Sequence, residues 1–550
     1  MNLRDAIFLS ILLCSACTDD PVNPNLEADD NDTGTPTFSA RCSALTDLAL
    51  EAGKIVAANW TEESPFSDLS DDPNGPTTPI PAHCTVRAKM TPTSNSDINI
   101  EIWLPADGWN GRFLGVGNGG YAGDLNVSHM AIALQRGYAT ATTDTGHGLV
   151  GTEVWVPGNP EKVEDYGHRA IHLAAVVGKR LVAVFYGSPP EYSYFSSCSN
   201  GGRQALMEAV RYPDDYDGII AGAPAADLNG LLIASMGRNA EILHDTPIDQ
   251  SMAVLISDAV IKQCDVNDGV ADGVIASPPA CDFDASSLAC TTDKQQNCLT
   301  PAQVEALTEI RAPRLDSEGR YLGAGFSVGG ESSIPPSGGW GPWILGSREA
   351  PSIQWSFFHR YMQDFLMENP DWSIEDFDLE RDIAHGRSKL GAVLDANDPN
   401  LSAFAESGGK LIIWHGWSDA AIPARSSIHL FESMIDEMGD QAVGDFARLY
   451  MAPGVHHCAF GPGPWSFNPL AAVHPLEPRR DMAATMERWV ENGVAPAELI
   501  AVLPKDPMAA FRGDYPVEAE KEGLLCPYPE EAHYAGAGDP ALADSYECRN

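Results

Sequence analysis

Residues 198–225 read CSNGGRQALMEAVRYPDDYDGIIAGAPA, and the aromatic-rich segment YSYFSS (residues 192–197) stands directly before them. Its alternating aromatic residues predict a short strand. The next part, residues 202–211, has helical composition, with Ala205 and Leu206 on one face. The segment DGIIAGAP (residues 217–224) predicts a second, buried strand. The stretch therefore predicts a strand, a tight turn, a helix and another strand.

The turn of this unit carries a candidate nucleophile. Its residues 197–201, SCSNG, resemble the G-x-S-x-G elbow on which an α/β-hydrolase presents its serine. The second glycine is present, and Ser197 replaces the first by another small residue. Small neighbours are needed because the elbow holds the serine in a strained backbone conformation and brings helix and strand close together. An ordinary Gly-rich loop is the alternative, but the flanking strand and helix favour an α/β-hydrolase fold with Ser199 as nucleophile.

Two later segments supply partners for Ser199, since the catalytic residues of this fold follow the chain order Ser, Asp or Glu, His. Residues 410–414, KLIIW, predict a buried strand, and Asp419 lies in the loop after it. Another short strand, LYMA, precedes the loop with His456 and His457. We predict that His457 is the general base and that Asp419 orients it. The alternatives are a loop-capping Asp419 and a structural His457, with His456 as the rival base.

Two cysteines flank these candidates. Cys198 directly precedes Ser199, and Cys458 directly follows His457. A disulfide between them would place the serine beside the histidine, and a nucleophile and its base must lie within hydrogen-bond reach. This symmetry is the reason to prefer His457 over His456.

An oxyanion hole needs two backbone donors. The amide of Asn200 is one by position, and the segment FLGVGNGGY (residues 113–121) offers Gly119 or Gly120 as the other. Its glycines allow the backbone to approach a substrate oxygen closely. The segment also matches a loose G-x-G-x-x-G pattern, but the βαβ context with a later acidic residue is missing. We therefore reject a dinucleotide site.

A second motif, CDVNDGVADGVI (residues 264–275), predicts a calcium loop. Calcium prefers hard oxygen ligands drawn from carboxylates and backbone carbonyls. The candidate ligands are the carboxylates of Asp265, Asp268 and Asp272 and the carbonyls of Val270 and Val274. The spacing is not that of an EF-hand, and an Asp-Gly turn with solvated carboxylates is the alternative.

Together these residues resemble the tannase and feruloyl esterase family, which includes mono(2-hydroxyethyl) terephthalate hydrolases. The match covers most of the chain after residue 40, and residues 198–225 are highly specific to it. The resemblance implies an α/β-hydrolase with a large lid, the triad Ser199, Asp419 and His457, and a structural calcium in the lid at the five positions above. It also implies the Cys198–Cys458 bridge.

The other cysteines favour disulfides as well. Twelve cysteines, less Cys14 and Cys17 near the N-terminus, leave an even number in an exported chain. Sequence alone does not fix their connectivity. Proximity and the family resemblance suggest the pairs Cys42–Cys84, Cys264–Cys281, Cys290–Cys298 and Cys526–Cys548.

The N-terminus predicts export. Residues 6–13 are apolar but too short to span a membrane, and residues 13–17, LCSAC, resemble a bacterial lipoprotein cleavage site with Cys17 lipidated. We predict a signal peptide over 1–17 and a disordered acidic linker over 18–39. The protein is then an outer-membrane or cell-surface lipoprotein. Because Cys14 departs from the usual aliphatic residue, cleavage with release into the periplasm or medium is the alternative.

Composition and charge limit which partners the protein can bind, and the pattern along the chain indicates its domain organisation. The chain has 550 residues, 44% of them hydrophobic, with 77 acidic against 34 basic residues and a net charge of -43. This charge disfavours nucleic acids and anionic membrane surfaces as partners, leaving a lipid anchor as the membrane contact. The strand–helix rhythm breaks between residues 227 and 391. We therefore predict one hydrolase domain in two parts, 40–226 and 392–550, around a lid domain over 227–391 that carries the calcium loop.

Substrate identity is where the sequence is least informative. Trp340 and Trp343 either wall an aromatic-acyl pocket or pack the core of the lid, while Arg348, His359 and Arg360 are expected at solvated surface positions. The first interpretation is an esterase acting on small aromatic esters of the feruloyl or galloyl type. The second is a terephthalate monoester hydrolase, which needs a cation in the lid to hold a carboxylate. The third is a calcium-stabilised surface binding protein without catalysis, which the complete set of catalytic residues disfavours.

Overall fold

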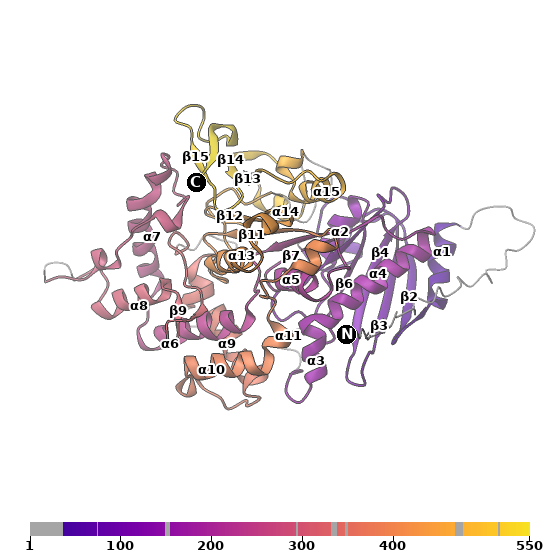
Figure 1. Cartoon of the computed structure of the whole chain (residues 1–550), viewed down its shortest axis with the longest axis horizontal. Helices are drawn as coiled ribbons and strands as arrows, with labels where there is room; N and C mark the ends of the chain where they lie inside the picture. Colours follow the sequence, from indigo (N-terminus) through magenta and orange to yellow (C-terminus); the bar gives the residue numbers. More distant parts are fainter. Residues whose placement is uncertain are drawn as a thin grey trace, which may run out of the picture. The chain divides into compact units, whose positions relative to one another are not determined.

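A ten-stranded sheet runs through the centre of the described chain (Figure 1). The computed structural model describes residues 37–73, 75–148, 154–292, 295–331, 338–346, 350–467, 477–514 and 517–550. The predicted signal peptide with Cys14 and Cys17, and the predicted linker up to residue 36, lie outside the described residues. Residues Phe38–Asn550 group into one compact unit.

The strand order is β1-β2-β3-β4-β6-β5-β7-β8-β11-β12. Strands β1 to β4 pair antiparallel, β4 pairs antiparallel with β6, and all pairs from β6 to β12 are parallel. A mostly parallel sheet agrees with the predicted α/β class. The strand bounds are β1 Ala49–Leu50, β2 Gly53–Thr61, β3 His83–Met90, β4 Ile98–Pro105, β5 Arg112–Val116, β6 Ala139–Thr143, β7 Tyr192–Cys198, β8 Gly218–Gly222, β11 Lys410–Gly416 and β12 Ala447–Ala452.

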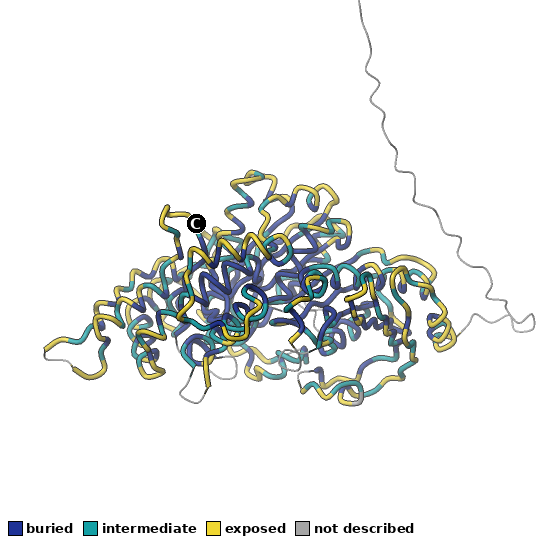
Figure 2. Tube along the Cα trace, turned by 90° about the horizontal axis from the view of Figure 1, so that it is seen from below, coloured by how far each residue is buried: buried dark blue, intermediate teal, exposed yellow. Residues whose placement is uncertain are grey.

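Helices cover both faces of the sheet, which explains why the central strands are apolar throughout. Every residue of β8, GIIAG, is buried, as expected for a parallel strand between two helical layers. Ile219 packs in the core shared with α4, α5 and α13, whereas Ile220 packs in the core shared with α2 and α15. Figure 2 shows the buried residues concentrated along the middle of the molecule. The helix bounds are α2 Val127–Gln135, α4 Ala170–Tyr186, α5 Asn200–Arg211, α13 Arg425–Met438 and α15 Met482–Asn492.

The strand–turn–helix–strand unit forms as predicted, as β7, α5 and β8. Helix α5 begins at Asn200, two residues before the predicted start. The reason is that the chain reverses at a single residue, Ser199, instead of through a longer loop. The elbow thus leaves the serine between the last residue of a buried strand and the first turn of a helix.

The described part of residues 227–391 is mostly helical, and its helices contribute to two buried cores that also contain residues from outside the segment. One core gathers around Phe358, Tyr361 and Phe365, and another around Ile256 and Trp340. Figure 1 shows helices α6 to α10 grouped together on the side away from β2 and β3. The bounds of this segment's main elements are α6 Arg238–Asp245, α7 Gln250–Cys264, α8 Pro301–Arg311, β9 Arg314–Leu315, β10 Tyr321–Gly323, α9 Ile353–Arg360 and α10 Leu379–Gly386.

Two short hairpins complete the C-terminal part, β13 with β14 and β15 with β16. Disulfides hold this and other regions, and all five predicted pairs are confirmed. They are Cys42–Cys84, Cys198–Cys458, Cys264–Cys281, Cys290–Cys298 and Cys526–Cys548. The hairpin bounds are β13 Leu499–Pro504, β14 Ala519–Leu525, β15 Glu531–Tyr534 and β16 Tyr546–Arg549.

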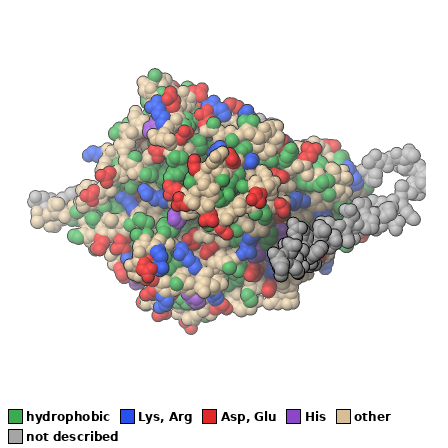
Figure 3. Space-filling view, in the orientation of Figure 1, with side chains coloured by type: hydrophobic (Ala, Val, Ile, Leu, Met, Phe, Trp, Pro, Cys, Tyr) green, Lys and Arg blue, Asp and Glu red, His purple; other side chains and the backbone are tan. Residues whose placement is uncertain are grey.

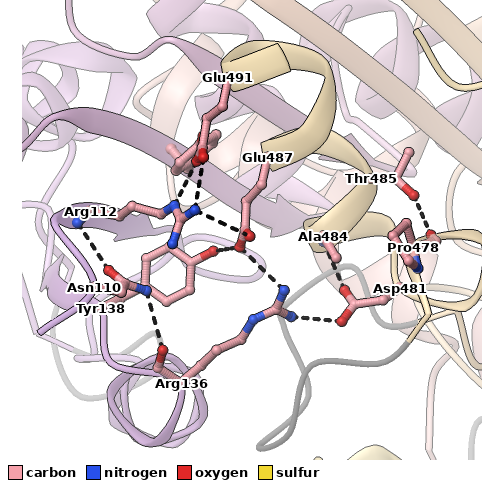
Figure 4. Close-up of polar contacts among 11 residues, drawn as sticks. Asn110, Arg112, Arg136, Tyr138, Pro478, Asp481, Ala484, Thr485, Glu487 and Glu491 are labelled. Atoms are coloured by element: carbon pink, nitrogen blue, oxygen red, sulfur yellow. Dashed lines mark hydrogen bonds and ion pairs between the residues drawn. The ribbon is translucent and has the colours of Figure 1, made fainter. Parts of the chain in front are cut away.

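A network of ion pairs fixes α15 to the sheet (Figure 4). Arg112, at the start of β5, forms a bidentate pair with Glu491 at 2.6 and 2.8 Å. Arg136, after α2, binds Asp481 at 2.7 Å and Glu487 at 3.2 Å. These side chains are largely buried, so their geometry is better defined than that of surface pairs. The network therefore determines how α15 sits on the strands that end at the candidate site.

The surface in Figure 3 carries acidic side chains over the whole visible face, with basic ones scattered among them. This agrees with the net charge of -43. No helix of the described residues is long and apolar enough to cross a bilayer.

Candidate active site

The elbow holds Ser199 in an unusual backbone conformation, with φ of 67° and ψ of -124°. Such strain is typical of a nucleophile elbow. The small neighbours that the sequence analysis required are explained by close approach. A Cβ at Gly201 would overlap Ser197 Oγ, and one at Gly202 would overlap the carbonyl of Gly222 on the adjacent strand.

The structure brings Ser199, His457 and Asp419 into one hydrogen-bonded chain. Ser199 Oγ lies 2.9 Å from His457 Nε2, and His457 Nδ1 lies 2.7 Å from Asp419 Oδ2. A carboxylate only accepts, so Nδ1 carries the proton and Nε2 is free to accept from the serine hydroxyl. The arrangement is that of an activated nucleophile with its base and an orienting acid.

Asp419 is fully buried and its carboxylate is held by four groups. Its Oδ1 accepts the amides of Ala421 and Ile422 at 2.7 and 2.9 Å. Its Oδ2 accepts from His457 and lies 3.3 Å from His415 Nε2. Burial alone would raise the pKa of Asp419, but His457 and His415 outweigh it and hold that pKa well below its usual range. Asp419 is therefore ionised when His457 becomes a charged imidazolium.

The rival base, His456, is not among the described residues that line the cavity at Ser199, whereas His457 is. His456 is buried, and burial lowers its pKa to about 4. The bridge between Cys198 and Cys458, with Cα atoms 5.9 Å apart, joins β7 to the histidine loop. It places His457 opposite Ser199 as the symmetry of the two cysteines predicted.

The predicted oxyanion segments also meet beside the serine. Asn200, Gly119 and Gly120 line the same cavity as Ser199. Asn118 holds the glycine loop in place, because its backbone N–H donates to Gln204 Oε1 of α5 at 3.0 Å. Both glycines remain candidates for the second donor.

A cavity of about 370 Å³ opens over this site. None of its described lining residues is Asp, Glu, Lys or Arg, and most are apolar. Burial in such surroundings favours an uncharged ligand, because a charged one would lose its hydration without a partner. The apolar lining side chains include Leu228, Leu231, Leu232, Met236, Trp343, Phe357, Trp414, Ile422 and Phe511.

The two tryptophans have different places. Trp343 lines the cavity and meets the His457 ring edge-on at 5.2 Å, whereas Trp340 is buried in the core of the inserted segment. His359 and Arg360, expected at solvated surface positions, are half-buried. His359 stacks on Trp355, and Arg360 pairs with Asp364 at 3.1 Å, because both side chains lie against the aromatic core of the segment. Arg348 lies outside the described residues.

The predicted calcium loop is ordered by its own carboxylates. Asp265 Oδ1 accepts the amides of Asp272 and Gly273 at 3.1 and 2.8 Å, and Asp268 Oδ1 accepts the amide of Val270 at 3.0 Å. The second oxygen of Asp272 pairs with Lys521. Three carboxylates in one short loop are a donor set that suits calcium, and Lys521 supplies a competing cation at one of them.

Another cluster lies at the far end of α5. Among the described residues, His172, Glu208 and Asp215 are the one group of three potential metal ligands within 4.8 Å of one another. Asp215 binds His172 Nδ1 at 2.6 Å and Lys179 Nζ at 3.3 Å. Burial, followed by the charge of Asp215, raises the pKa of Glu208 well above its ordinary value. His172 and Lys179 already bind Asp215, so we interpret this group as structural.

Similarity to known proteins agrees with this geometry. The family model for tannase and feruloyl esterase matches residues 84–549. The chain belongs to the tannase and feruloyl esterase family. This membership makes it a carboxylic ester hydrolase with the α/β-hydrolase fold, as predicted.

Individual members of the tannase and feruloyl esterase family resemble the chain over most of its length. An uncharacterised esterase of Xanthomonas campestris pv. campestris is 32% identical, covering 94% of this chain and 92% of that protein. A probable feruloyl esterase B-2 of Aspergillus flavus is 33% identical, covering 75% and 78%. The crystal structure of feruloyl esterase B from Aspergillus oryzae superposes with a TM-score of 0.81 at 27% identity, covering 93% of this chain and all of that one.

Several residues of the site were not found from the sequence. His415, near the end of β11, contacts the acid at 3.3 Å. Tyr166 and Arg203 both bind the side chain of Asn200. The signal available was a charged arginine directly after two glycines, at the start of a helix that the sequence already placed in the core.

Proposed function

We propose that the chain is a serine carboxylesterase that hydrolyses aromatic esters of the feruloyl or galloyl type through an acyl-enzyme on Ser199. The observation that carries this proposal is the hydrogen-bonded chain from Ser199 through His457 to Asp419 at the floor of an apolar cavity. The same hydrogen-bonded triad disfavours the interpretation as a binding protein without catalysis.

The residues divide the reaction as follows. His457 takes the proton of Ser199 as the hydroxyl attacks the ester carbonyl, and Asp419 stabilises the imidazolium. The amide of Asn200, with that of Gly119 or Gly120, stabilises the tetrahedral oxyanion. His457 then gives its proton to the leaving alcohol. A water molecule, activated by the same imidazole, finally releases the aromatic acid and restores the serine.

The cavity supports an uncharged aromatic acyl group. Its described lining holds aromatic and branched aliphatic side chains and no charged residue. Names of relatives point the same way, since several are probable feruloyl esterases. A terephthalate monoester would bring a free carboxylate, and the nearby cation Arg360 is already paired with Asp364 and is not among the lining residues. This observation ranks the terephthalate alternative second.

One polar position on the cavity wall suits a substrate hydroxyl or methoxy group. His129 lines the cavity, and its Nδ1 lies 2.9 Å from the side-chain nitrogen of Asn126. Because that amide donates, Nδ1 accepts and Nε2 carries the ring proton. Burial lowers the pKa of His129 to about 4, so the ring is a neutral donor at pH 7. It is able to recognise a phenolic or ether oxygen without demanding a charge.

Three further proposals concern the rest of the chain. Residues 227–391 act as a lid, supported by Leu231, Trp343 and Phe357 in the cavity wall. Calcium binds the loop of residues 265–274 and stabilises that lid. The protein is exported, supported by its five disulfides, and Cys17 anchors it to a membrane through a lipid.

A hydrolysis panel tests the proposed function. The purified protein, with calcium, is assayed on methyl ferulate, methyl gallate, mono(2-hydroxyethyl) terephthalate and a short p-nitrophenyl ester, each beside Ser199→Ala. We expect turnover of methyl ferulate or methyl gallate to exceed that of the terephthalate monoester and to disappear in the variant. Faster turnover of the terephthalate ester would favour the second interpretation. Inactivity on all four would contradict the proposal.

A further inference from the structure

Arg203 is a buried cation directly behind the oxyanion hole. It lies on the first turn of α5, four residues after Ser199, and its side chain is fully buried. Among the described residues no carboxylate forms an ion pair with it within 4.0 Å. Its donors instead meet neutral oxygens: Asn200 Oδ1 at 2.8 Å and the carbonyls of Gly167 at 2.8 Å, Tyr166 at 3.2 Å and Leu394 at 3.3 Å.

The acid whose charge acts on Arg203, Asp395, forms its hydrogen bonds elsewhere. Asp395 binds the backbone and side-chain amides of Asn229 at 3.0 and 2.9 Å. Burial, followed by the charge of Asp227, raises the pKa of Asp395 to about 7, so it is partly protonated at neutral pH. Burial lowers the pKa of Arg203, but a guanidinium remains protonated inside proteins. Burying a charge without a counter-ion costs several kcal/mol, so this placement calls for a role.

The contacts of Arg203 lead to both segments of the oxyanion hole. Its Nε and the Tyr166 hydroxyl, at 3.0 Å, both donate to Asn200 Oδ1. The Asn200 side-chain nitrogen donates to the carbonyl of Asn118 at 3.4 Å, next to Gly119. Asn200, whose backbone amide is the first oxyanion donor, is thereby held against the glycine loop that supplies the second donor. The positive end of the α5 dipole also lies at Asn200, where the helix begins.

We propose that Arg203 is a positioning residue of the oxyanion hole, which holds Asn200 through its side chain and adds a positive charge, without a directly paired carboxylate, beside the place where the tetrahedral intermediate becomes negative. This inference rests on the proposed function of Ser199. Preorganised charge in a dry site acts on the transition state more than on the neutral ester. Loss of Arg203 should therefore lower kcat with little change in KM.

The test compares Arg203→Met and Arg203→Lys with the wild type. Each is measured for kcat and KM on methyl ferulate, for inhibition by an aryl boronic acid, and for binding of the neutral amide of ferulic acid. The boronic acid forms a tetrahedral anion on the serine, whereas the amide resembles the ground state. We expect Arg203→Met to lower kcat and boronate affinity by about 10²-fold each, in the range of a lost oxyanion donor. Amide affinity and KM should change less than about threefold, and Arg203→Lys should lie between.

Arg314 offers a matched control. It is also buried and also donates to neutral oxygens, such as those of Ala312 and Asn239, but none of its hydrogen-bond acceptors belongs to the oxyanion segments. Arg314→Lys should lower thermal stability without changing the ratio of boronate to amide affinity. If Arg203→Met does not fold, the same ratio in Arg203→Lys decides the question. Equal weakening of boronate and amide, or full boronate affinity, would overturn the role of Arg203.

The two levels of the account fail in different ways. Hydrolysis retained by Ser199→Ala would overturn the proposed function itself. Hydrolysis that depends on Ser199 but not on Arg203 would overturn only the present inference.

Discussion

Removal of the Cys198–Cys458 bridge should separate catalysis from stability. The bridge joins residues 260 apart, so the chain-entropy model gives about 5.5 kcal/mol of stabilisation, an upper value because other bridges already restrict the unfolded chain. Its second effect is local. Ser199 and His457 are each bonded to one of the two cysteines, and their 2.9 Å contact depends on the two loops staying in register.

The double variant Cys198→Ala/Cys458→Ala should therefore lose activity even where it is fully folded. A displacement of about 1 Å between reacting groups costs on the order of 10²-fold in rate. We expect a loss of that size in kcat on methyl ferulate, measured well below the melting temperature of the variant. The melting temperature itself is followed by circular dichroism, so that unfolding is not mistaken for misplacement.

The Cys526–Cys548 bridge provides the matched control. It joins residues 22 apart in the C-terminal hairpins and has no member in the cavity wall. The same model gives about 3.4 kcal/mol for its removal. Cys526→Ala/Cys548→Ala should lower the melting temperature and leave kcat close to that of the wild type. Full kcat in the folded Cys198→Ala/Cys458→Ala protein would refute the argument that this bridge aligns the base.

Three other predictions follow from individual contacts. Asp419→Asn should lower kcat by about 10⁴-fold with KM little changed, since an amide favours the wrong imidazole tautomer; steady-state kinetics would show it, and a loss under tenfold would count against the triad. Removing calcium with a chelator should lower the melting temperature, and Lys521→Met, which frees Asp272, should tighten calcium binding in a calorimetric titration; unchanged affinity would contradict competition at that carboxylate. The free energy of unfolding of Glu208→Gln should exceed that of the wild type by more as pH rises. In the wild type, a buried Glu208 with a raised pKa stays protonated in the folded state, whereas the unfolded chain ionises above about pH 4.5. Wild-type stability therefore falls as pH rises from that value towards the folded pKa. Denaturant unfolding at pH 5 and pH 8 tests the last, and a difference between the proteins that does not grow with pH would exclude a protonated Glu208.

The elbow and its partners were predictable because they follow local rules. A serine between a strand and a helix, small residues at fixed offsets, and a loop acid and histidine after short apolar strands are all visible in a few residues each. The neighbouring cysteines then indicated which histidine faces Ser199, and the structure places His457 there and His456 elsewhere.

The parts that were not predictable depend on tertiary packing. Trp340 and Trp343 are three residues apart in one segment, and only the fold decides that the first packs a core and the second faces the cavity. Arg360, expected at a solvated position, is half-buried because it pairs with Asp364 on a helical turn whose Tyr361 and Phe365 are buried. The roles of Tyr166 and Arg203 arise from their contacts with Asn200. Tyr166 lies on a different helix, Asp165–Arg169, so its contact with Asn200 cannot be read from the sequence around Ser199.

The measurement that tests the central claim most directly is the identification of the acyl-enzyme. An activated feruloyl ester is mixed with the protein, quenched within the first turnover, and the peptide that contains Ser199 is weighed by mass spectrometry. We predict a feruloyl adduct on Ser199 in the wild type, together with a burst of released alcohol, and neither in Ser199→Ala. An adduct on another residue, or hydrolysis that continues in Ser199→Ala, would contradict the account.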